Sequence, residues 1–100
     1  MTQTKMPTLA DAFMALLPGA TIVNIFEHSW HSATFSGLRV EIQLALAGDA
    51  AYDCVHGFAE ILPAHEFDLR RYLVADIFVG DIQENPDNIG CCIEALLIDA

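Results

Sequence analysis

The clearest pattern of hydrophobic and polar positions lies in residues 38–46. Apolar residues occupy Leu38, Val40, Ile42, Leu44 and Leu46, and polar residues occupy Arg39, Glu41 and Gln43 between them. Strict alternation of this kind is typical of a strand in an antiparallel sheet that has one covered face. The pattern predicts a long strand over residues 33–47, with a bulge expected at Gly37.

Two other segments show the 3.6-residue period of an amphipathic helix. The apolar positions of the first are Leu9, Ala12, Phe13, Leu16 and Leu17, and those of the second are Ala51, Cys54, Val55, Phe58, Ala59 and Leu62. Thr8 is a candidate N-cap for the first helix, which ends at Pro18-Gly19. Asp49 is a candidate N-cap for the second helix, expected over residues 50–62 and ending before Pro63.

Three further segments are predicted to be strands, the first of which is rich in β-branched and aromatic residues. They cover residues 21–30, 72–82 and 91–98. Turns are expected at residues 29–32 and at residues 83–90, where Asn85-Pro86-Asp87-Asn88 supplies turn-forming residues. The core of the segment 72–82, residues 73–80, is apolar on both faces except for Asp76. This predicts a central strand, or a strand whose outer face meets another subunit.

The predicted order is therefore α-β-β-α-β-β, an α+β fold with a four-stranded antiparallel sheet and both helices on one face. Two short matches favour a duplicated αββ unit. Residues 13–18 resemble residues 58–63 at an offset of 45, and Val40-Glu41-Ile42 resembles Ile93-Glu94-Ala95 at a different offset. The alternative is chance similarity between short apolar segments. In either case the sheet face opposite the helices is left partly bare.

Composition adds an expectation of self-association. The chain has 100 residues, which fit one domain, and 54% of them are hydrophobic. This fraction exceeds what a small interior needs, so a homo-oligomer interface is the ordinary way to bury the excess. The alternative is that the abundant alanine inflates the count. Residues 1–7 are expected to form a flexible tail.

Charge excludes several classes of partner. Fourteen acidic residues face only four cations, Lys5, Arg39, Arg70 and Arg71, and the net charge is -10. Nucleic acid and anionic membrane surfaces are therefore not expected as partners. No apolar run is long enough to span a membrane, and Asp11 and Pro18 argue against a signal peptide. The three cysteines do not form a disulfide framework, so a cytoplasmic location is expected.

Candidate chemistry is sparse. Glu27, His28 and His31 could hold a metal ion if the chain turned between the two histidines, but in a straight strand these histidines point to opposite faces. Asp53, His56 and Glu60 share a helix face that is better explained as solvated. The adjacent Cys91 and Cys92 are expected to pack structurally, and no phosphate-binding loop occurs. No cofactor is expected.

The sequence therefore favours a small cytoplasmic homo-oligomeric interaction module without catalytic activity. Its working surface would be the bare sheet face or an edge strand. The residues expected on that surface are Trp30, Phe35, Tyr72, Val74, Phe78, Leu96 and Ile98. The alternative is a small-ligand or metal-binding protein, conceivably an enzyme, with its site around Glu27, His28 and His31.

Overall fold

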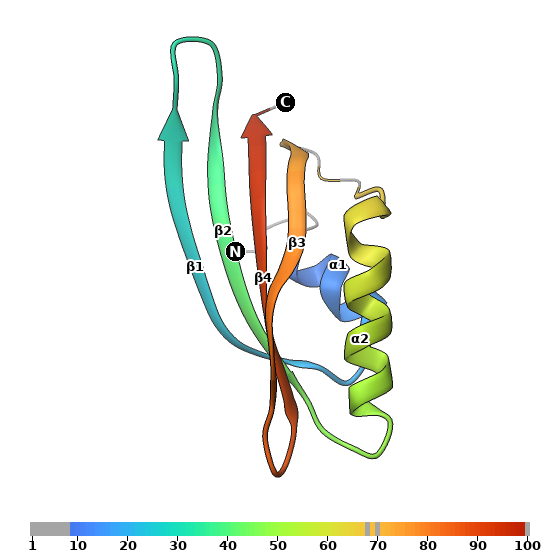
Figure 1. Cartoon of the computed structure of the whole chain (residues 1–100). Helices are drawn as coiled ribbons and strands as arrows, with labels where there is room; N and C mark the ends of the chain where they lie inside the picture. Colours follow the sequence, from blue (N-terminus) through green and yellow to red (C-terminus); the bar gives the residue numbers. More distant parts are fainter. Residues whose placement is uncertain (1–8, 68, 70, 100) are drawn as a thin grey trace, which may run out of the picture.

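The computed structural model describes residues 9–67, 69 and 71–99, so the expected tail and the Thr8 cap lie outside the described residues. The elements are α1 (Leu9–Leu16), β1 (Thr21–His31), β2 (Ser36–Leu46), α2 (Ala51–Ile61), the 3-10 turn η1 (Leu62–Ala64), β3 (Tyr72–Glu84) and β4 (Ile89–Asp99). This is the predicted α-β-β-α-β-β order. The four strands form one antiparallel sheet in the order β1-β2-β4-β3, with both helices on the same side (Figure 1).

The alternating pattern of β2 builds the sheet side of the core. Val40, Ile42, Leu44 and Leu46 are buried, and the polar residues between them face the other way. The central strand β4 shows the same alternation, with Ile89, Cys91, Ile93, Ala95 and Leu97 buried. The two central strands thus supply most of the surface against which the helices pack.

The helices complete the core through Phe13 of α1 and Phe58 of α2. The two rings meet edge to face, with centroids 5.7 Å apart, and Phe67 contacts Phe13 in the same way at 6.0 Å. Helix α2 begins after Ala50, which makes no side-chain cap, so the Asp49 cap is not formed. No helix in the described part of the chain is long and apolar enough to cross a membrane.

Several boundaries differ from the expected ones. Strand β1 continues through His31, and the turn comes later, where Ser32 N–H donates to the Phe35 carbonyl at 2.7 Å. Strand β3 is an edge strand and not a central one. Gly37 marks no bulge: a Cβ there would fall on the backbone carbonyl of Leu97, so the position needs glycine for close approach to β4.

The bulges lie in the edge strands instead. The register of β1 shifts between Ile22 and Asn24, and that of β3 shifts between Val74 and Asp76 and again between Val79 and Asp81. The single-residue excesses therefore fall at Val23, Ala75 and Gly80. A bulge changes which side of the sheet the following residues face.

The two halves of the chain repeat one arrangement. Residues 22–26 (Ile-Val-Asn-Ile-Phe) match residues 74–78 (Val-Ala-Asp-Ile-Phe), and both segments carry a register shift at the same place. Phe26 pairs with Glu41 as Phe78 pairs with Glu94, and the two glutamates pair with each other. A local two-fold axis between Glu41 and Glu94 therefore relates the halves, which supports a duplicated αββ unit.

Candidate interaction surface

The side of the sheet away from the helices, called here the open face, is built from cross-strand rows of residues. The rows, each written from β1 through β2 and β4 to β3, are Trp30–Gly37–Ile98–Leu73, His28–Arg39–Leu96–Asp76, Phe26–Glu41–Glu94–Phe78 and Asn24–Gln43–Cys92–Asp81. Directly opposite residues lie about 4.5–5.5 Å apart, so each row is a line of neighbouring side chains.

Four of the residues expected at an interface lie on the open face. Trp30, Leu96 and Ile98 are half-buried there, and Phe78 is 42% exposed. The indole Nε1 of Trp30 is buried and has no hydrogen-bond partner in the described residues. The structure therefore brings these four apolar residues together on one surface.

The other three expected residues lie elsewhere. Tyr72 and Val74 face the helix side, where both are partly buried against the core. The bulge at Ala75 causes this, because it puts Val74 and Phe78 on opposite sides although they are four residues apart. Phe35 is exposed in the β1–β2 turn.

Sequence reasoning missed four exposed apolar residues of the sheet, one of which, Val23, is 60% exposed at the bulge of β1. Phe26 is 46% exposed on the open face, Leu73 is exposed beside Ile98, and Ile25 is 45% exposed on the helix side of β1. The signal that could have found Ile25 and Phe26 is the repeat of Ile-Phe at residues 77–78. β1 is exposed on both sides because it is the strand farthest from the two helices (Figure 1).

Carboxylates occupy the centre of the open face. Glu41 and Glu94 are directly opposite each other, and neither makes an ion pair with any residue that the structure describes. Like charges in this position destabilise a sheet. Asp76 and Asp81 lie on the same face and are exposed, so Asp76 meets solvent and not a buried arginine. Arg39 is the one cation among the described residues of these rows.

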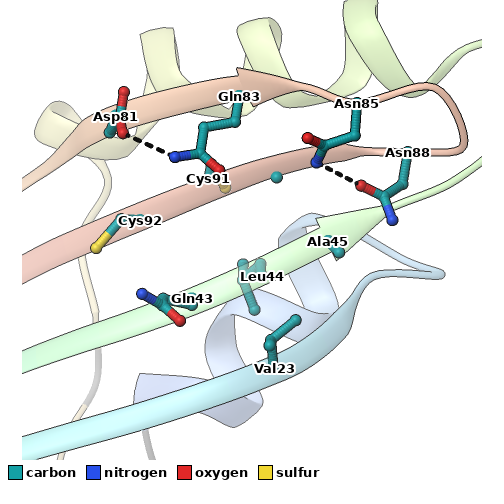
Figure 2. A pocket seen from close by; sticks show the side chains of 11 residues that line it. Val23, Gln43, Leu44, Ala45, Asp81, Gln83, Asn85, Asn88, Cys91 and Cys92 are labelled. Carbon is teal, nitrogen blue, oxygen red and sulfur yellow. Dashed lines mark hydrogen bonds between the residues drawn. The ribbon is translucent and has the colours of Figure 1, made fainter.

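A shallow hollow of about 450 Å³ adjoins this acidic centre (Figure 2). Its lining is Val23, Gln43, Leu44, Ala45, Asp81, Gln83, Asn85, Asn88, Gly90, Cys91 and Cys92. Gln83 Nε2 donates to Asp81 Oδ2 at 3.3 Å, and Asn85 Nδ2 donates to Asn88 Oδ1 at 2.9 Å. Three of the lining amides, those of Gln83, Asn85 and Asn88, are thus engaged in hydrogen bonds with neighbouring side chains.

The thiols at this end of the sheet are poor nucleophiles. Burial, together with the neighbouring Cys92, raises the pKa of the Cys91 thiol to about 11. Burial also raises the pKa of Cys92, and the nearby carboxylates of Glu41, Glu94 and Asp81 raise it further. A reactive cysteine needs a lowered pKa, so neither residue is activated.

Glu27, His28 and His31 do not converge. All three lie within the continuous strand β1, with His28 on the open face and Glu27 and His31 on the helix side. In the described part of the chain no group of three His, Cys, Asp or Glu side chains is placed to hold a metal ion. His56 stacks against Tyr52, with ring centroids 4.2 Å apart.

Comparison with known proteins adds no relative. No protein-family model, no curated protein and no solved structure matches the chain. The features that remain are an uncovered edge strand and an open face with an acidic centre and aromatic flanks.

Proposed function

We propose that the protein is a small, non-catalytic assembly module that forms a homodimer by pairing β1 with β1 of a second copy. The observation that carries this proposal is the exposure of β1. Ile25 is 45% exposed and Phe26 is 46% exposed, on opposite sides of the same edge strand. A long edge strand with exposed apolar side chains, which no described element covers, is a template for another strand.

The other edge strand, β3, is protected against such pairing. Its two register shifts break the line of outward-pointing backbone groups, and Asp76 and Asp81 follow these shifts directly. Bulges and charges are the usual devices that prevent edge-to-edge association. β1 has one register shift near its start and then pairs regularly from Asn24 to His31. Of the two edges, β1 is therefore the one that is free to pair.

The hydrogen-bond pattern of β1 shows which backbone groups are available. The hydrogen bond from Ser32 to Phe35 makes that pair a hydrogen-bonded one. Hydrogen-bonded and non-hydrogen-bonded pairs alternate along an antiparallel ladder. By this alternation, the N–H and C=O groups of Ile25, Glu27, Ser29 and His31 point away from β2. They are the groups that a second strand would meet.

Charge and register favour a pairing centred on His28 over pairings centred on Glu27 or Phe26. Centring the ladder on Glu27 would set that carboxylate against its own copy, which is unfavourable. Centring it on Phe26 would draw the bulge at Val23 into the ladder. Centring it on His28 avoids both, pairs residues 25–31 of each copy, and sets Phe26 opposite Trp30 of the second copy. Aromatic pairs across strands are stabilising.

Dimerisation through the open face is disfavoured by its charge. Packing this face on itself would bring together Glu41, Glu94, Asp76 and Asp81 of both copies, against one Arg39 from each. Edge pairing keeps these carboxylates apart, because the two sheets then extend each other side by side.

A proline substitution tests the proposal. Ser29→Pro removes an N–H that points outward and should leave β1–β2 pairing intact. We expect the wild-type protein to sediment as a dimer and Ser29→Pro to weaken dimerisation by at least about tenfold, because each copy loses one hydrogen bond, two in the dimer, and the proline rings add steric exclusion. Ser29→Ala is the matched control and should remain a dimer. A monomeric wild-type protein, or a Ser29→Pro dimer of unchanged affinity, would refute the proposal.

A cysteine at the proposed axis tests the register. In a Cys54→Ser background, which removes the exposed native thiol, His28→Cys should form an intermolecular disulfide under mild oxidation. Ser29→Cys in the same background should cross-link much more slowly, because it would face Glu27 of the other copy. Equal cross-linking of both variants would show that the register is wrong.

A further inference from the structure

The centre of the open face carries two adjacent negative charges. In the row Phe26–Glu41–Glu94–Phe78, two carboxylates stand side by side between two half-exposed aromatic rings. Glu94 leans over Gly80, so that its Oε2 lies 2.6 Å from where a Cβ of residue 80 would be, close to the Phe78 ring. The glycine thus leaves room for the carboxylate beside the aromatic side chain.

No cation of the described residues neutralises this pair. Arg39 lies one row away, opposite His28 and Leu96, and makes no ion pair with Glu41 or Glu94. Burial, and after it the nearby carboxylates of Glu41, Glu94 and Asp81, raise the pKa of the Cys92 thiol beside this pair. An unneutralised like-charge pair costs stability in the free protein, and a cation from outside would remove that cost.

We infer that the open face binds a basic amphipathic helix of another protein, with an arginine or lysine between Glu41 and Glu94 and an apolar residue against each of Phe26 and Phe78. A bare antiparallel sheet face is covered in layered folds by helices or by another sheet. A second sheet of this protein is disfavoured by the charge. Pairing of β1 with its copy leaves the open face free, so this inference is independent of the dimer.

The spacing of the row fits a helix. Four neighbouring strands place Phe26 and Phe78 about 14 Å apart, three times the distance between strands. Residues i, i+4 and i+8 of a helix lie on one side and span about 12 Å. A sequence of the form Leu-x3-Arg-x3-Leu therefore sets its two leucines near the aromatic rings and its guanidinium between the carboxylates. Arginine can also make two hydrogen bonds to a carboxylate and can stack on an aromatic face.

The hollow described above lies next to Glu41 and Glu94 and makes the surface concave there. Gln43 and Cys92 line it and belong to the row beside Glu41 and Glu94. Asp81, also in the lining, adds another carboxylate that can accept a hydrogen bond (Figure 2). A further basic or amide side chain of a bound helix can enter there, while an acidic segment would be repelled.

The test uses synthetic peptides and the single tryptophan of the protein. Trp30 lies on the open face, so its fluorescence reports binding directly. The probe is an alanine-based helical peptide of about 16 residues that carries Leu-x3-Arg-x3-Leu. Two comparison peptides replace the arginine by glutamate or place a proline in the middle. We expect binding of the first peptide, little binding of the other two, and weaker binding at high salt.

Matched variants distinguish binding at Glu41 and Glu94 from non-specific attraction of a basic peptide to an acidic protein. Glu41→Gln with Glu94→Gln should weaken binding of the arginine peptide by about tenfold or more. Glu60→Gln with Glu66→Gln makes the same change of net charge at exposed positions off this face and should leave binding within about twofold. Phe78→Asp should abolish binding. Equal effects of the two double variants would overturn the inference, as would equal binding of the proline peptide.

One more outcome concerns self-association. If the wild-type dimer dissociates in the Phe78→Asp variant and persists in Ser29→Pro, the open face is occupied by a second copy, and both the helix inference and β1 pairing fail. If Ser29→Pro is monomeric and still binds the arginine peptide, both hold. If Ser29→Pro is monomeric and binds no peptide, while the wild-type protein also binds none, only the helix inference fails.

Discussion

The residues Ile25-Phe26 and Ile77-Phe78 occupy equivalent places in the two halves of the molecule and meet different surroundings. Each pair follows a register shift in an edge strand, and each phenylalanine lies opposite a glutamate of a central strand. The two phenylalanines are similarly exposed, at 46% and 42%. The isoleucines differ: Ile25 is 45% exposed and Ile77 only 5%. Similar strand sequences thus lie at both edges of the sheet, and only the isoleucine of β3 is part of the core.

The difference lies in the helices that accompany the strands. Helix α2 and the 3-10 turn η1 together run from Ala51 to Ala64 and pack against β3. Helix α1 has eight residues, and its buried Phe13 is directed at Phe58 and Phe67. β1 therefore receives no equivalent cover. The helix side of β3 is therefore part of the core, whereas the helix side of β1 is exposed.

The largest expected effect comes from breaking the contact between the two halves. Phe13→Ala removes a fully buried ring that contacts both Phe58 and Phe67. We expect the free energy of unfolding to fall by about 3–5 kcal/mol, measured by urea denaturation followed by circular dichroism. Phe35→Ala, at an exposed ring in the β1–β2 turn, is the control and should change stability by less than about 0.5 kcal/mol. Similar losses for the two variants would contradict the packing described.

The isoleucine pair tests the comparison itself. Ile77→Ala should cost about 2–4 kcal/mol of folding stability, because the side chain is only 5% exposed and its loss leaves a cavity in the core. Ile25→Ala should cost less than about 1 kcal/mol in a monomeric Ser29→Pro background, because its side chain is already in water. Thermal and urea unfolding of the two variants would measure the difference. Equal destabilisation would mean that β1 is covered after all.

The smallest effect distinguishes two equivalent glycines of the central strands. Gly37 and Gly90 are each four residues before the paired glutamate of their strand. Gly37→Ala should destabilise the fold by about 1–3 kcal/mol, because the new Cβ meets the Leu97 carbonyl. At Gly90 the nearest atom to a Cβ is the Leu44 carbonyl oxygen at 3.7 Å, so Gly90→Ala should be neutral within about 0.5 kcal/mol or slightly stabilising. The reverse order would show that the close approach of β2 and β4 at Gly37 is not maintained in solution.

Much of the fold could be predicted from the period of the hydrophobic residues and from the residues that end helices and strands. The alternation in residues 38–46 and the helical spacing around Phe13 and Phe58 correspond to buried or half-buried positions, except that Cys54, expected on the apolar face of the second helix, is exposed. Those patterns are local and repeat at a fixed period, so they can be recognised without knowing which elements pack together. Strand ends were less predictable, as the continuation of β1 to His31 shows.

The surface was harder to predict for two physical reasons. Bulges invert the two-residue period, which is why Val74 and Phe78 were expected on one side and lie on opposite sides. The pairing of Glu41 with Glu94 depends on β2 and β4 being neighbours, although α2 and β3 separate them along the chain. Neither fact is encoded in a short window of sequence. The exposure of β1 likewise follows from which helix covers which strand.

The local two-fold axis between Glu41 and Glu94 has a consequence for binding polarity. The row Phe26–Glu41–Glu94–Phe78 reads the same from either end, so a ligand with a central cation between two apolar groups fits it in both chain directions. Two equivalent poses favour association by a statistical factor of two, about 0.4 kcal/mol. The chain direction of the ligand must then be determined by contacts away from the axis. Trp30 and Leu73 lie on one side of the row, and the polar hollow lies on the other. The proposed binding would therefore select the composition of a ligand first and its orientation second.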